Sequence, residues 1–191
     1  MFNLDSFIQP LNSIIQHLPY SLGLIAILWG VQIMNTLLRR RLNIFGIFPR
    51  HVVGLPGIVL SPLLHCNFAH LFANSIPLFV LMSFILVAGK SIFWCVTISI
   101  ILISGILTWC FGRKAIHIGA SSLVMGYFSY LLVNTYYHPT VFSIALVLVV
   151  LYYFGGLVLS LFPTDIKTSW EGHVFGFIAG LITPLICGHF I

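Results

Sequence analysis

The sequence has very little charge, and acidic side chains are the scarcest group. Only 6% of its 191 residues are charged, and three of them are Asp or Glu. A water-soluble domain carries about 25% charged residues, so this chain has too little polar surface to cover a soluble globule. Hydrophobic residues make up 60% of the chain instead. This composition favours a protein whose solvent is the lipid bilayer.

Other absences exclude further classes of function. The eight Lys and Arg residues are spread over loops without forming a basic face, so we expect no nucleic-acid partner. The four cysteines form no CxxC pair and three lie in apolar runs, so we do not expect a disulfide framework. No HExxH motif is present and acids are few, so we expect neither a metal site nor a cofactor.

Apolar runs of membrane-spanning character occur six times in the chain. They cover residues 21–38, 65–88, 93–111, 121–136, 141–162 and 170–187. Residues 1–20 mix apolar with polar positions, which predicts an N-terminal helix at the membrane interface. We therefore predict an all-α, polytopic membrane protein. Residues 1–191 should form a six-transmembrane-helix bundle in a single domain, without a soluble domain.

Residues 42–61 are apolar but interrupted by Gly and Pro at 46, 49, 54, 56 and 57. The segment is too broken to span a membrane and too apolar for an aqueous loop. Irregular backbone at membrane depth is tolerated only where protein covers it or where it lines a cavity. We predict a membrane-embedded first loop.

The fourth run is short, and its length places Ser121 inside the membrane. Sixteen helical residues rise about 24 Å, whereas the hydrocarbon core is about 30 Å thick. If the far end of this helix reaches the opposite interface, Ser121 at its N-terminus lies below the near surface. Polar groups at that depth are candidates for function by default.

The polar groups suit acyl transfer. His70 and Asn74 are four residues apart, on one helix face. Gly172, Gly176 and Gly180 form a small-residue stripe that lets a neighbouring helix approach closely, and His173 lies beside it. If the neighbour is the fourth helix, His173 can reach Ser121. Histidine is the usual base for a serine nucleophile, and His70, Asn74 and the backbone N–H of Ser121 are candidate oxyanion donors.

No carboxylate is placed to complete a triad. Asp5 lies at the N-terminus, Asp165 lies in a loop, and Glu171 is two residues from His173 and so points elsewhere on a helix. The sequence therefore predicts a dyad. A haem protein is disfavoured because no two histidines sit half a membrane apart on paired helices. A transporter is disfavoured because the polar groups converge on one end instead of following a path.

Taken in order, these motifs resemble the rhomboid family of intramembrane serine proteases, in its compact bacterial GlpG type. The residues that carry the resemblance are His65, His70 and Asn74 (HxxxxHxxxN), Gly119-Ala120-Ser121 (GxS), and His173, Gly176 and Gly180 (HxxGxxxG). The resemblance implies a serine endopeptidase with Ser121 as nucleophile and His173 as general base. His70, Asn74 and the Ser121 N–H would form the oxyanion hole.

The resemblance also implies the setting of the reaction. The substrates would be single-span transmembrane proteins, cut at small residues in a helix that unwinds easily. The chain would be a multi-pass protein of the bacterial cytoplasmic (inner) membrane, with its active site opening to the non-cytoplasmic side. The Lys/Arg distribution favours the opposite orientation, because seven of the eight lie in the odd loops, at the active-site end. The oligomeric state stays open.

The sequence departs from the family pattern at three places. Ser122 replaces the usual Gly after the nucleophile, and Met125 replaces an aromatic that stacks on the histidine. A Trp-Arg pair of the first loop is replaced by Pro56-Gly57, so the anchoring of that loop must differ. The alternative function is an inactive rhomboid-like protein that binds transmembrane helices.

Overall fold

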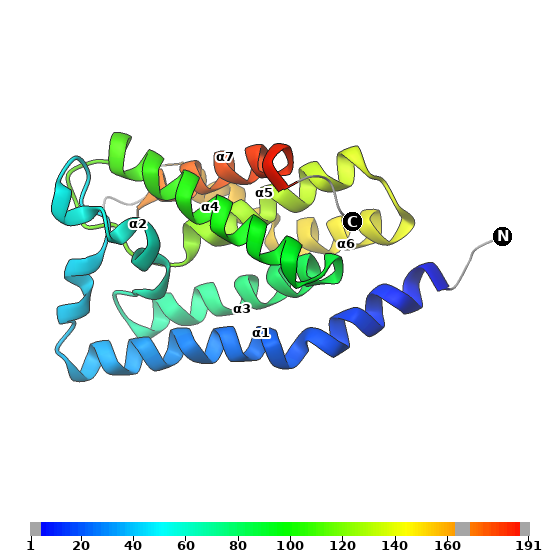
Figure 1. The fold of residues 1–191 in the computed structure, drawn as a ribbon, viewed down its shortest axis with the longest axis horizontal. Coiled ribbons are helices and arrows are strands. Elements are labelled where there is room, and N and C mark those ends of the chain that lie inside the picture. The colour runs from blue at the N-terminus through cyan, green and yellow to red at the C-terminus, as the bar shows by residue number, and fades with distance from the viewer. Residues whose placement is uncertain (1–4, 163–168, 188–191) are drawn as a thin grey trace.

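The computed structural model describes residues 5–162 and 169–187, and the all-α prediction is confirmed there. The long helices are α1 (Asp5–Leu37), α3 (Phe68–Ile85), α4 (Lys90–Phe111), α5 (Ser121–Tyr137), α6 (Val141–Phe154) and α7 (Trp170–Cys187). Successive helices run up and down the bundle (Figure 1). The starts of α3, α5 and α7 therefore meet at one end, together with the end of α4.

Within the described residues, five segments are long and apolar enough to cross a membrane, so the chain is a multi-pass membrane protein. They are Phe7–Leu37, Phe68–Ala88, Lys90–Phe111, Val141–Leu161 and Trp170–Cys187. Helix α5 is the exception, with 17 residues. It begins at Ser121, the residue at which the sequence predicted the start of the short helix.

Helix α1 is longer than the predicted first span. It runs from Asp5 to Leu37 as 33 residues without a break, although Pro10 and Pro19 lie inside it. The N-terminal segment and the first span are thus one continuous helix. The interfacial placement of residues 1–20 stays a prediction.

The first loop is built from short helical turns that pack against the bundle. These are η1 (Arg41–Phe45), η2 (Val52–Gly54), α2 (Gly57–Leu60) and η3 (Ser61–Leu63). The Arg50 guanidinium donates to the carbonyls of Cys110, at 3.1 Å, and Gly112, at 2.9 Å. The indole N–H of Trp109 donates to the His51 carbonyl at 2.9 Å. Arg50 of the loop and Trp109 of α4 therefore anchor this loop to the C-terminal end of α4.

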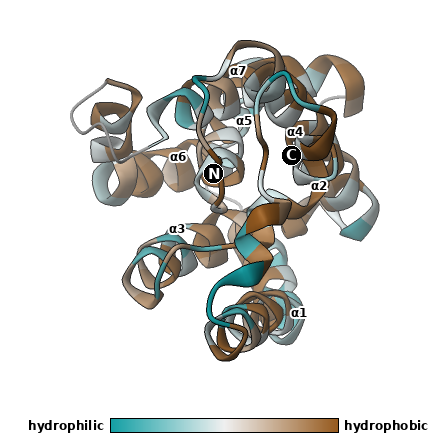
Figure 2. Ribbon diagram, turned by 90° about the vertical axis from the view of Figure 1, so that its left-hand side faces the viewer, coloured by the Kyte–Doolittle hydropathy of each residue, from teal (hydrophilic) through white to brown (hydrophobic). Residues whose placement is uncertain are grey.

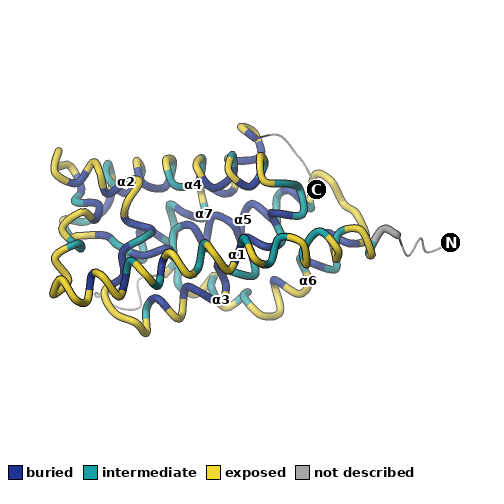
Figure 3. Tube along the Cα trace, turned by 60° about the horizontal axis from the view of Figure 1, so that its bottom comes forward, coloured by how far each residue is buried: buried dark blue, intermediate teal, exposed yellow. Residues whose placement is uncertain are grey.

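Helix α5 occupies the middle of the bundle. Viewed along the bundle, it is surrounded by α3, α4, α6 and α7 (Figure 2), and every residue from Leu123 to Leu131 is buried (Figure 3). The glycine stripe of α7 lies on it. A Cβ atom added to Gly176 would be 2.1 Å from the Ser122 carbonyl oxygen, and one added to Gly180 would be 2.0 Å from that of Gly126. Only glycine permits this approach, and the neighbour of the stripe is α5.

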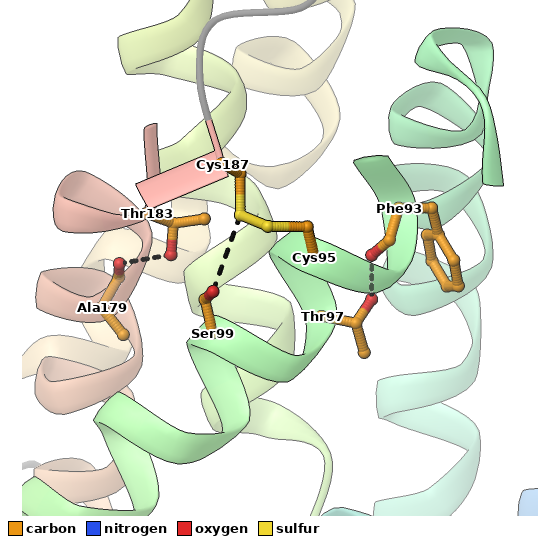
Figure 4. Close-up of a disulfide and its surroundings, with 7 residues drawn as sticks. All are labelled: Phe93, Cys95, Thr97, Ser99, Ala179, Thr183 and Cys187. Atoms are coloured by element: carbon orange, nitrogen blue, oxygen red, sulfur yellow. Dashed lines mark hydrogen bonds between the residues drawn. A yellow bond between two sulfur atoms is a disulfide. The ribbon is translucent and has the colours of Figure 1, made fainter. Parts of the chain in front are cut away.

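A disulfide joins Cys95, near the start of α4, to Cys187, the last residue of α7 (Figure 4). The expectation that the cysteines would not pair is wrong for these two. Their sequence separation is 92, and their Cα atoms are 5.9 Å apart. No local spacing signals such a bond, because it arises only when α4 and α7 pack antiparallel. The bond lies at the end of the bundle opposite Ser121.

Candidate active site

The backbone before α5 is a tight turn that leaves the Ser121 amide available. Gly119 has φ 123°, a conformation that favours glycine. Its N–H donates to the Ser61 carbonyl at 2.9 Å, and the Ala120 N–H donates to His65 Nε2 at 3.4 Å. The next N–H belongs to Ser121, the first residue of the helix, where no helical carbonyl can accept it.

His70 lies against this turn. A Cβ atom added to Gly119 would be 2.7 Å from the His70 Cε1 atom. Both the positive φ and this close approach therefore favour glycine at the first position of the GxS motif. The Asn67 side chain caps α3 by accepting from the His70 N–H at 2.7 Å. On the other side of the ring, the Cys66 sulfur is 3.3 Å from Nδ1. The turn and the start of α3 thus hold each other in place.

Asn74 lies one helical turn beyond His70 and is buried. Its side-chain nitrogen, Nδ2, has no hydrogen-bond partner within the described part of the chain. A buried donor without an acceptor is costly, and in a native structure it calls for an explanation. A site that binds an oxyanion only during reaction leaves such a donor unpaired at rest.

His173 reaches the same end of the bundle through the packing of α7 on α5. The two helices run in the same direction, with Gly176 on Ser122 and Gly180 on Gly126. His173 precedes Gly176 by three residues and is therefore level with the start of α5. The helix packing thus gathers His70, Ser121 and His173 at one level.

The two predicted catalytic side chains do not bond to each other at rest. Among the described residues, Ser121 and His173 make no direct hydrogen bond, and His173 Nδ1 donates to the Ser160 carbonyl at 3.0 Å. Catalytic hydrogen bonds are often long in the absence of substrate and tighten in the complex. This hydrogen-bond partner of His173 is a backbone carbonyl of η5 (Gly155–Leu161), which the sequence did not predict.

A small cavity with hydroxyl groups in its wall adjoins Ser121. Its polar lining comprises Ser61, Ser104, Thr108, His117, Ser121, Ser122 and Ser169. Hydroxyl and imidazole groups are the partners that a water molecule needs in an otherwise apolar interior. Ser121 therefore faces a polar cavity inside a bundle whose exterior is apolar.

A polar network between the loop before α5 and the start of α7 was also missed. Arg113 Nε is 3.5 Å from Glu171 Oε1, and His117 Nε2 lies 3.0 Å from the Arg113 carbonyl. His117 Nδ1 bonds the Ser169 hydroxyl, and burial lowers the pKa of His117. The Glu171 carboxylate thus faces Arg113 and not His173, as its spacing on a helix predicted. The spacing of residues in the sequence could not predict the other contacts of this network, because their partners come from separate segments of the chain.

The comparisons with known proteins agree with this arrangement. A family model described as the Rhomboid domain matches residues 50–190. Relatives include the uncharacterized proteins Mb1372 of Mycobacterium bovis and Rv1337 of Mycobacterium tuberculosis. Each is 37% identical over 174 residues, which covers 86% of this chain and 72% of the relative. The uncharacterized protein ML1171 of Mycobacterium leprae is 35% identical, with 69% of its length covered. The chain belongs to the rhomboid family.

Proposed function

We propose that this chain is an intramembrane serine endopeptidase that cleaves single-span transmembrane proteins with the dyad Ser121 and His173. The observation that carries the proposal is the junction of α3, α5 and α7. There His70 lies on Gly119, and Gly176 lies on Ser122. This packing brings the start of α5 level with His173. A nucleophile, a base and donors for an oxyanion are the parts that acyl transfer requires.

Each of these groups has a defined role in the reaction. His173 Nε2 takes the proton of the Ser121 hydroxyl as the oxygen attacks the scissile carbonyl carbon. The negative charge that develops on the carbonyl oxygen is met by the Ser121 N–H, Asn74 Nδ2 and His70. His173 then gives its proton to the leaving amine. Water from the polar cavity hydrolyses the acyl-enzyme, with His173 again as base.

The setting of the reaction follows from the family and the composition. Substrates enter from the lipid bilayer, and the cleaved bond lies beside small residues in a helix that unwinds easily. We place the chain in the bacterial cytoplasmic (inner) membrane, with the site opening to the non-cytoplasmic side, as in the GlpG type that the sequence resembles.

The test is proteolysis of a single-span substrate in liposomes. Ser121→Ala and His173→Ala should each lower the turnover at least about 10³-fold, because either change removes the dyad. Ser122→Ala is the matched control and should retain activity, and a fluorophosphonate should label Ser121 alone. Cleavage that survives both dyad substitutions contradicts the proposal. Substrate that binds to the native protein but is never cut would instead support the inactive helix-binding alternative.

A further inference from the structure

The second nitrogen of the His173 ring has a partner that is not an acid. In a serine triad, a carboxylate holds the base in the correct tautomer and orientation. Here the only described acid near His173 is Glu171, whose side chain pairs with Arg113. His173 Nδ1 instead donates to the Ser160 carbonyl oxygen at 3.0 Å. That oxygen belongs to η5, a different segment from α7.

We propose that the Ser160 carbonyl takes the positioning role of the missing triad acid. A carbonyl oxygen only accepts hydrogen bonds, so Nδ1 must carry the proton of the neutral ring. Nε2 is then unprotonated, as the base for Ser121 must be. The bond also fixes the rotation of the ring about the side chain. The proposal rests on the proposed function, because it assigns the orientation of its base.

The position of this carbonyl depends on how η5 sits on the bundle. The Ser160 hydroxyl donates to the Leu157 carbonyl at 2.6 Å and lies 4.0 Å from the sulfur of Met125, which is buried in α5. The Leu157 side chain packs against the hydrophobic core, whereas Leu159 is 69% exposed. Met125 thus supports the segment that bonds His173, in the place where the family has an aromatic that stacks on the histidine.

The packing of Leu157 gives a matched pair of variants. Leu157→Ala removes the side chain that seats η5, and Leu159→Ala makes the same truncation in the same segment without touching the core. We expect Leu157→Ala to lower kcat about 10- to 100-fold, because small misplacements of catalytic groups cost that much. KM should stay nearly unchanged, and Leu159→Ala should match the native protein.

Determining the tautomer of His173 tests the positioning role of the Ser160 carbonyl directly. In protein labelled with ¹⁵N-histidine, the His173 resonances, assigned by their loss in His173→Gln, should show a protonated Nδ1 and an unprotonated Nε2 at neutral pH. In Leu157→Ala a second population with a protonated Nε2 should appear. Placing the α-hydroxy analogue of leucine at position 161 converts the Ser160 carbonyl to a weaker ester acceptor. This ester substitution should also increase the population of His173 with a protonated Nε2, and it alters no side chain.

The outcomes separate this proposal from the proposed function. A native His173 with its proton on Nε2 overturns it, and so does a fall in kcat in Leu157→Ala without any change in the tautomer. A protonated Nδ1 that shifts as expected in a protein that cleaves no substrate would support the positioning role while removing the protease assignment.

Discussion

His65 holds the turn before Ser121, and only its neutral ring can do so. It is fully buried in the loop before α3, where its Nε2 atom accepts from the Ala120 N–H. Burial, with a smaller contribution from His70, lowers the pKa of His65 from 6.5 to about 4. Protonation would remove the acceptor and leave a charge buried in the loop. The geometry of the GxS turn is thus linked to pH through one side chain.

The stability of the fold should fall in acid because of His65. Its pKa is lower in the fold than in the unfolded chain, so the unfolded chain takes up the proton first. The contribution is complete above pH 6.5 and is lost progressively toward pH 4. The loss should reach about 3 kcal/mol. His65→Gln keeps an acceptor but does not titrate, so its unfolding in detergent should be less sensitive to pH between 7 and 4.5. Equal sensitivity in both proteins would contradict this account.

Single residues were also the level at which the sequence was most informative. Ser121, His70, Asn74 and His173 could be chosen because polar groups are rare in this chain and stand out against apolar runs. Ser160 could not be chosen, because it acts through a carbonyl that every residue possesses. The fit of Gly119 against His70 is equally invisible, since its contact partner lies on another helix.

The packing of α7 on α5 is the contact between elements that assembles the site. The glycine stripe predicted a close approach of two helices, and the structure has this approach with α5 as the partner. The sequence could predict the stripe because it repeats every four residues. It could not predict the anchors of the first loop, because Arg50 bonds backbone carbonyls at the C-terminal end of α4, far along the chain.

Adding one methyl group to this interface should separate the helices. In Gly176→Ala the new Cβ meets a backbone carbonyl at 2.1 Å, and backbone cannot move aside as a flexible side chain can. We expect a loss of about 1–3 kcal/mol in unfolding free energy, typical of overpacking, together with a loss of proteolysis. Gly30→Ala is the control, since nothing lies within 4 Å of its added Cβ. It should be neutral or stabilising by about 0.5–1 kcal/mol, as in an ordinary helix interior. Equal effects of the two substitutions would refute the packing argument.

The two ends of the bundle differ. The Ser121 end is polar and carries most of the cationic side chains, and at the opposite end a disulfide joins α4 to α7. Arg39, Arg40, Arg41, Arg50, Arg113 and Lys114 lie at the Ser121 end, and Lys90 lies at the other. The family orientation places the Ser121 end outside the cytoplasm. The charge distribution favours the reverse.

Cys66 reports the orientation directly, because it is free, exposed and located at the Ser121 end. In a Cys110→Ser background, which removes the other free cysteine of the described residues, we expect a membrane-impermeant maleimide to label Cys66 in intact cells, and Cys66→Ser to abolish that labelling. Labelling only after lysis would contradict the proposed orientation. It would agree instead with the Lys/Arg count and with a disulfide at the opposite end, since oxidising compartments maintain such bonds.

The link between Cys95 and Cys187 also makes α7 a lever. Because the two helices are joined at one end, any tilt of α7 relative to α4 pivots at Cys187. His173 lies 14 residues from that pivot, a lever arm of about 21 Å. A tilt of about 5° therefore moves the imidazole by roughly 2 Å, more than the 1 Å misplacement that can cost about 10²-fold in rate. Reducing the disulfide would allow α7 to tilt relative to α4. A reductant should therefore lower the rate of cleavage before any helix unfolds.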